Sequence, residues 1–280
     1  ASTCATTYRK ALDPVRDTVR SAVTTFAVNM AGSTSIGDGL QLAQSELNPV
    51  STYDVKATVV FTDGYENSSA FIADVASSIS DRTYAVALGR AENIRPATLT
   101  TVTNGTGGYC VLTNDLGIDS RYKLAKYFLQ VLAGVKNDQI VLDPPILMLP
   151  GVDVDVPFDL NETDFAVDVV LMTEHPSLVD MTLIAPDGSL VDPALVGAIG
   201  GRNYVKVGKD VGYRHGALPA PVGGGAREGT WIARFHLSEK RLRKAYGKGR
   251  EGEIDADEYG MITHKGLPGT VLVHASSDLQ

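Results

Sequence analysis

The segment Thr58-Val59-Val60-Phe61-Thr62-Asp63-Gly64 determines how the rest of the sequence is interpreted. Its β-branched and aromatic residues form a short apolar run, which is typical of a strand covered on both faces of a parallel sheet. The run ends at Asp63-Gly64, a turn signal. We therefore expect Asp63 at the carboxyl end of a parallel strand, where open α/β sheets bind their ligands. An aspartate that only closes a turn or caps the next helix is the alternative.

Helical and strand-like segments alternate around this strand. Apolar residues recur at helical spacing in several segments, and these predict helices at residues 13–30, 37–47, 68–80, 93–103 and 118–135. Apolar runs of strand length predict strands at residues 56–62, 83–88 and 107–112. Strands that alternate with helices predict an α/β unit with a parallel sheet and flanking helices.

The pattern changes after Val135. Two proline-rich turns, Asp143-Pro144-Pro145 and Leu149-Pro150-Gly151, introduce a region of short segments in which apolar and polar residues alternate. Such alternation predicts strands with one buried face, and several of them separated by turns predict an antiparallel β-sandwich. We therefore expect two domains, residues 1–137 and 138–280, with a polar insertion at 238–260 between two strands of the second.

The charge distribution limits the kinds of partner. The formal net charge is −8, and acidic and basic residues balance in the first 137 positions, so the excess lies in the second half. An acidic chain argues against nucleic acid as a partner and is compatible with divalent cations or basic proteins. No apolar run approaches the length of a membrane span. Cys4 and Cys110 allow one disulfide bridge or two free thiols.

Two motifs together resemble a von Willebrand factor type A domain. The first is Gly32-Ser33-Thr34-Ser35-Ile36-Gly37-Asp38-Gly39-Leu40, and the second is Phe61-Thr62-Asp63-Gly64. Later features fit in the same order, namely Leu88-Gly89 and Gly107-Gly108-Tyr109. The resemblance covers residues 9–136 and implies a Rossmann-like sheet, in which Thr34 and Asp63 bind a metal ion at a metal-ion-dependent adhesion site.

The metal that this resemblance implies is Mg²⁺ or another divalent cation. Mg²⁺ prefers oxygen ligands in octahedral geometry and keeps several waters. A hydroxyl from Thr34 and a carboxylate from Asp63 are ligands of this kind, and an open position would accept an acidic side chain of a partner protein. Binding of the partner would then depend on the metal.

One family motif is missing. The family's first metal loop, Asp-x-Ser-x-Ser, does not occur in these 280 residues, and the comparison implies that the preceding strands are missing too. The strand at 56–62 would then be an exposed apolar edge, which favours pairing with another strand. We therefore expect a weak or incomplete metal site, and a complementary chain or segment that supplies the missing strands.

The second half also resembles a known domain. Leu183-Ile184-Ala185-Pro186-Asp187-Gly188 and the later Gly229-Thr230-Trp231 are similar to the β-sandwich that follows the type A domain in calcium-activated chloride channel regulator-like proteins and bacterial surface proteins. Each of these two motifs also has a simpler interpretation. Pro-Asp-Gly is a common turn, and Trp231 is explained most simply as a core residue.

These observations predict a non-enzymatic protein-interaction or adhesion module, secreted or on a cell surface. Two alternatives remain open. The chain could be an accessory domain of a larger metalloprotease-like or chelatase-like enzyme, or a structural module with an inactive metal site. No Ser-His-Asp elbow, phosphate loop or histidine metal spacing is present in the sequence.

Overall fold

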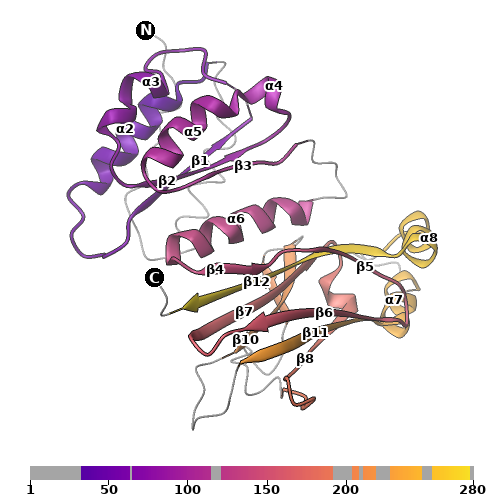
Figure 1. Cartoon of the computed structure of the whole chain (residues 1–280). Helices are drawn as coiled ribbons and strands as arrows, with labels where there is room; N and C mark the ends of the chain where they lie inside the picture. The colour runs from indigo at the N-terminus through magenta and orange to yellow at the C-terminus, as the bar shows by residue number, and fades with distance from the viewer. Residues whose placement is uncertain are drawn as a thin grey trace. The chain divides into compact units, whose positions relative to one another are not determined.

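The computed structural model describes residues 33–63, 65–114, 121–191, 204–207, 211–218, 228–247 and 254–277 (Figure 1). The chain forms two compact units, residues 1–116 and 117–280. This division comes earlier in the chain than the expected boundary at residue 137, and it assigns helix α6 to the second unit. The helix expected at 13–30, Cys4, Gly32 and Gly64 lie outside the described residues.

The first unit contains a parallel sheet of three described strands. Its order is β1-β2-β3, with β1 at Ala57–Thr62, β2 at Arg82–Ala87 and β3 at Cys110–Leu112. Both pairs are parallel, and β1 runs beside β2 along its whole length. This arrangement matches the strands predicted from the apolar runs.

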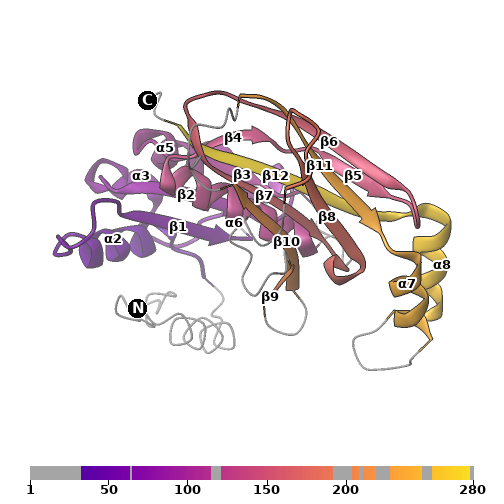
Figure 2. The same ribbon diagram turned by 90° about the horizontal axis from the view of Figure 1, so that it is seen from below.

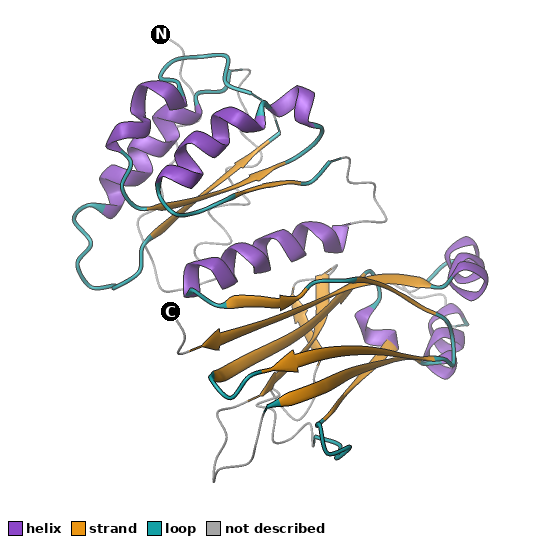
Figure 3. Ribbon diagram, in the orientation of Figure 1, coloured by secondary structure: helices purple, strands orange, loops and turns teal. Residues whose placement is uncertain are grey.

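Helices cover one face of this sheet (Figure 3). They are α2 (Ile36–Leu47), α3 (Ile72–Val75) with the 3-10 turn η2 (Ala76–Ser78), α4 (Ala91–Ile94) and α5 (Pro96–Gly105). The two longer helices start at residues that favour a helix N-terminus. The Ser35 side chain caps α2 by accepting the Asp38 N–H, and Pro96 is the first residue of α5. Their apolar side chains pack on the alternate strand residues Val60, Ala85 and Ala87.

The other face of the sheet differs between strands. Tyr84 and Val86 of β2 are buried, whereas Val59 and Phe61 of β1 are 42% and 49% exposed. Contrary to what its apolar run alone suggests, β1 is therefore not covered on both faces, and it agrees with the expectation of an exposed apolar edge. The physical reason is position: in the described sheet β1 is the outer strand and β2 the central one, and an outer strand is covered less completely.

The second unit is a two-layer antiparallel β-sandwich, as predicted. One layer has six described strands, β4-β12-β7-β10-β9 with β5 paired to β12, and the other has the order β6-β11-β8. The bounds are β4 Gln139–Leu142, β5 Pro145–Met148, β6 Asp153–Leu160, β7 Asp164–Thr173, β8 Val179–Ile184, β9 Tyr204–Val207, β10 Val211–Leu218, β11 Gly229–Leu237 and β12 Leu267–Ser277. A short 3-10 turn, η4 (Pro176–Leu178), precedes β8.

In the strands of the sandwich, every second residue points into the core. In β11 the inward residues are buried and share one cluster with the inward residues of β6, β7 and β12. The inward residues of β11 are Trp231, Ala233, Phe235 and Leu237. Trp231 is 7% exposed, which confirms its prediction as a core residue.

Helix α6 (Arg121–Lys136) packs on the outer face of the six-stranded layer. Tyr122, Ala125 and Leu129 of the helix contact Val170 and other apolar residues of that face. Strand β7 is therefore covered on both faces, which explains its unbroken apolar run from residue 169 to 172. The packing of α6 on this layer is the reason why it belongs to the second unit.

The polar insertion between β11 and β12 contains two helices, α7 (Glu239–Tyr246) and α8 (Ala256–Lys265) (Figure 2). The rings of Tyr246 and Tyr259 stack between them, with their centroids 4.5 Å apart. In the described ranges no helix has the length and apolar character that a membrane crossing requires.

Candidate interaction site at the carboxyl end of the parallel sheet

The segment before α2 is hydrogen-bonded to the loop that follows β1. The backbone N–H of Thr34 donates to Asn67 Oδ1 at 2.7 Å. In return, the N–H groups of Asn67 and Ser68 donate to the Thr34 carbonyl at 3.0 and 3.1 Å. The two sequence motifs, more than twenty residues apart in the chain, therefore adjoin at the carboxyl end of β1.

Asp63 lies in the same loop. It follows the last residue of β1 directly, and its side chain is exposed. Thr34 forms hydrogen bonds with Asn67 and Ser68, and among the described residues no hydrogen bond joins Thr34 to Asp63. The structure thus brings the two segments together, while the metal-binding role of Thr34 and Asp63 stays a prediction.

The two motifs supply one carboxylate and one hydroxyl as candidate oxygen ligands. Within the described ranges, no group of three or more His, Cys, Asp or Glu side chains is arranged to hold a metal ion. Asp63 supplies one carboxylate, and a threonine hydroxyl is a weak second ligand. A Mg²⁺ ion held by this pair alone would keep most of its waters.

Glu66 connects the two helix N-termini at this end of the sheet. Its Oε1 atom accepts the N–H of Gly37 at 2.9 Å, and both carboxylate oxygens lie 2.8 Å from the N–H of Ile72. These N–H groups belong to the first turns of α2 and α3, which have no partners within their own helices. A carboxylate is favourable at this position because it also complements the positive end of the helix dipole. Glu66 is not recognisable from sequence, because a single acidic residue in a polar loop forms no pattern.

Gly37 of the first motif has a steric role. A Cβ atom at this position would lie 2.5 Å from the carbonyl carbon and oxygen of Phe71 and 2.6 Å from the carbonyl oxygen of Ala70. Next to it, the Ser35 hydroxyl donates to the Ala70 carbonyl at 2.8 Å. The glycine therefore lets the start of α2 approach the chain just before α3.

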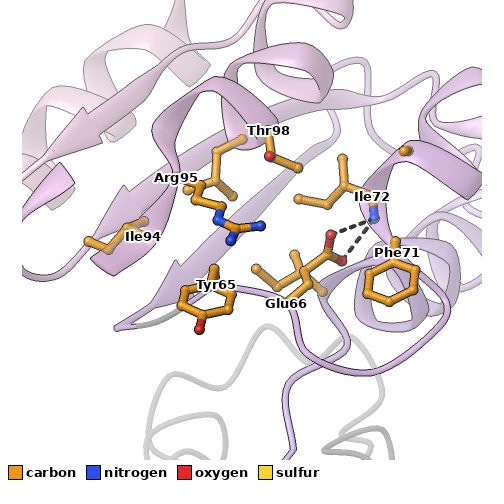
Figure 4. A pocket seen from close by; sticks show the side chains of 10 residues that line it. Tyr65, Glu66, Phe71, Ile72, Ile94, Arg95 and Thr98 are labelled. Atoms are coloured by element: carbon orange, nitrogen blue, oxygen red, sulfur yellow. Dashed lines mark hydrogen bonds between the residues drawn. The ribbon is translucent and has the colours of Figure 1, made fainter. Parts of the chain in front are cut away.

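A pocket of about 250 Å³ opens beside this loop (Figure 4). Its walls are largely apolar and come from the starts of α2 and α3 and from the α4–α5 region; they include Ile36, Phe71, Ile72, Ile94 and Leu99. Four polar side chains, Tyr65, Glu66, Arg95 and Thr98, also line it. The guanidinium carbon of Arg95 lies 4.7 Å from the centre of the Tyr65 ring, a cation–π contact.

A second group of charged residues lies in the second unit, around a buried histidine. His274 Nδ1 is 2.9 Å from Asp138 Oδ2, and His274 Nε2 is 3.7 Å from Asp168 Oδ2. Lys136 Nζ is 2.8 Å from Asp138 and 3.7 Å from Asp168, which also contacts His215 at 2.7 Å. Both carboxylates already contact these positively charged or hydrogen-bonding partners, so we interpret the group as structural.

The pKa values of both aspartates are lowered. Burial alone would raise the pKa of Asp138, but hydrogen bonds from Lys136 and Ser276 and the nearby positive charges hold it below its ordinary value. Burial also opposes ionisation of Asp168, but the hydrogen bond and charge of His215, together with the charges of His274 and Lys136, outweigh it and lower the pKa of Asp168 too. Both groups are therefore more easily ionised in the folded protein than in the unfolded chain.

The second unit is expected to lose stability in acid because of these aspartates. A carboxyl whose pKa is lowered by folding stabilises the fold above its unfolded pKa of about 4, and that contribution is lost as the pH falls through the folded value. Urea unfolding of the second unit should therefore show a free energy that falls below about pH 4. Asp138→Asn should weaken this dependence, whereas Glu162→Gln, at an exposed loop position, should leave it unchanged. Equal pH dependence in both variants would contradict the assignment.

Comparison with known proteins gives limited matches. No family model matches the chain, and no curated protein matches it. Among solved structures, the chain is similar to the protein described as von Willebrand factor type A from Catenulispora acidiphila, with a TM-score of 0.35 and 16% sequence identity. The match covers 78% of this chain, which spans 42% of that protein.

Proposed function

We propose that the chain is a non-enzymatic protein-interaction module that contacts its partner at the carboxyl end of the parallel sheet. One observation carries the proposal: the segment with Thr34 is hydrogen-bonded to the loop with Asp63, as the paired motifs of a von Willebrand factor type A domain require. The apolar pocket next to this loop adds a surface for a partner side chain. By the same resemblance, the chain acts outside the cell or at its surface.

The role of a divalent cation in this module depends on ligands that the described residues lack. Thr34 and Asp63 would supply one hydroxyl and one carboxylate, whereas the family's site also uses an aspartate and two serines of a further loop. We propose that a complementary chain or segment bearing Asp-x-Ser-x-Ser completes the site. A completed site would bind an acidic side chain of a protein partner through the ion.

The isolated chain is therefore expected to bind Mg²⁺ weakly or not at all. Mg²⁺ gives up its waters reluctantly, and one carboxylate with one hydroxyl replaces them poorly. Isothermal titration calorimetry of Mg²⁺ into the 280-residue chain should show little heat, and addition of a segment with the missing loop should restore binding. Restored binding should be lost in Asp63→Ala.

The matched control is Asp54→Ala, which removes an exposed aspartate from the same unit. It should bind the ion as the unchanged chain does once the missing loop is supplied. Tight binding by the isolated chain that Asp63→Ala abolishes would contradict the incomplete site, because another residue would then replace the lost loop. If the supplied loop restores nothing, the proposal of a shared metal site fails.

A further inference from the structure

We propose that the pocket beside Glu66 binds a peptide carboxylate that lies next to an apolar side chain. The inference rests on the proposed interaction function and names the chemistry that a partner would present there. The pocket belongs wholly to the first unit, and its lining comes from the loop after β1, the starts of α2 and α3, and the α4–α5 region (Figure 4).

The apolar lining is firmly held by the core. Ile72, Ile94 and Leu99 are each at most 2% exposed and belong to the hydrophobic cluster between the helices and the sheet. Phe71, on the other wall, is 40% exposed. Ligand pockets are mostly apolar, with a small number of polar groups that fix the orientation of the ligand. The lining thus suits one aliphatic or aromatic side chain.

Arg95 supplies the polar contact. Its guanidinium group lies over the Tyr65 ring and points into the pocket (Figure 4). In the described part of the chain no carboxylate forms an ion pair with Arg95. A planar guanidinium matches a carboxylate with two parallel hydrogen bonds, so an anionic ligand group is favoured.

The carboxylate of Glu66 does not take this role. Its oxygens already accept the N–H groups of Gly37 and Ile72, at the positive ends of α2 and α3. These contacts offset its negative charge and hold it against the helix starts. A cationic ligand would compete with them for Glu66, whereas an anionic ligand meets a guanidinium that has no carboxylate partner among the described residues. The charge arrangement therefore favours a carboxylate.

The backbone holds Arg95 in one position. Arg95 ends α4 and precedes α5, its N–H donates to the Ala91 carbonyl, and its own carbonyl accepts the Thr98 N–H. Its φ of 53° lies in the left-handed region, which a residue with a Cβ adopts rarely and at a cost. Strained positions of this kind cluster at ligand-binding sites. The backbone thus fixes the base of the Arg95 side chain, and the contact with the Tyr65 ring orients its guanidinium, which reduces the freedom lost on binding.

Titration of short peptides into the full chain, monitored by ¹H–¹⁵N NMR in chloride buffer with EDTA, tests the proposal. One peptide ends in leucine with a free carboxylate. A second is amidated and carries an internal aspartate next to leucine, and a third is the amidated leucine peptide without a carboxylate. We expect the first or the second peptide, at millimolar concentration, to shift the backbone amide signals of Ile72 and Thr98 and the side-chain N–H signal of Arg95. The effective one identifies the source as a chain terminus or an acidic side chain.

Substitutions distinguish the contribution of the Arg95 charge from that of the pocket volume. Arg95→Gln should weaken binding by about tenfold or more, since hydrogen bonds between charged groups are lost. Thr98→Phe, which fills the pocket, should abolish it. Arg243→Gln removes an exposed arginine of α7 in the second unit and should have no effect.

Three results would overturn the proposal: no shift at the pocket with either carboxylate peptide, equal binding of the peptide that lacks a carboxylate, or unchanged binding by Arg95→Gln. EDTA removes any contribution of a metal ion. Failure here therefore leaves the Mg²⁺ titrations of the proposed function unaffected, and failure of those titrations leaves this result standing.

Discussion

Replacement of Gly37 by alanine is expected to lower the free energy of unfolding of the first unit by about 2–4 kcal/mol. The added Cβ would lie 2.5 Å from backbone atoms of Phe71, which cannot rotate away as a side chain can. The start of α2 would have to move away from the chain before α3. That movement would also stretch the hydrogen bonds from Gly37 and Ile72 to Glu66.

Gly39→Ala is the matched control in the same helix. Beyond its chain neighbours and the backbone of its own helix, no atom lies within 4 Å of a Cβ built at Gly39, so the substitution should be neutral or stabilise the unit by up to about 1 kcal/mol, since alanine favours the helix. Urea unfolding followed by circular dichroism compares the two variants. If Gly37→Ala is as stable as Gly39→Ala, the close contact between α2 and Phe71 does not exist in solution.

This pair of glycines shows how far the first motif could be interpreted from sequence. The motif predicted a loop that enters a helix near the ligand-binding edge, and the structure places α2 at the carboxyl end of β1. The motif alone did not distinguish Gly37, which makes a close backbone contact, from Gly39, which makes none. The difference depends on the path of the chain before α3, and local pattern does not encode that path.

Helix α6 shows a similar limit in the domain organisation. Its apolar periodicity correctly predicted a helix with one buried face, because that pattern depends on the helix alone. The layer on which it packs depends on residues far away in the sequence, among them Val170 and Leu272. The expected boundary at residue 137 therefore fell after the helix, whereas the compact units divide before it. The alternating strands of the second unit were predicted better, since a period of two specifies a half-buried strand directly.

The segments around the candidate site could be recognised only in part, because local motifs mark some of them and not others. Thr34 and Asp63 follow recognisable motifs, and the structure brings their segments together. Glu66 and Arg95 could not be found from sequence. Glu66 acts through N–H groups of α2 and α3, and Arg95 gains its position from a left-handed backbone between α4 and α5. Neither the alignment of two helix starts nor a backbone angle is visible in residue order.

The second large effect is expected in the β-sandwich. Phe235 is fully buried in β11, where it lies between Val154 of β6 and Met181 of β8 in the sheet register. Truncation of a buried phenylalanine removes its apolar contacts and leaves a cavity that the neighbours fill only in part, so Phe235→Ala should lower the free energy of unfolding by about 3–5 kcal/mol.

Leu190→Ala is the control, because Leu190 lies in the same unit and is 70% exposed. Its substitution should change the free energy of unfolding by less than about 0.5 kcal/mol. Urea unfolding with Trp231 fluorescence reports the second unit selectively, since Trp231 is the only tryptophan of the chain and lies in the sandwich core. Limited proteolysis of Phe235→Ala should degrade residues 117–280 first and leave a fragment of the first unit. Simultaneous loss of both halves would mean that the two compact units unfold together, and an unchanged Trp231 transition would mean that Phe235 is not in the core of the sandwich.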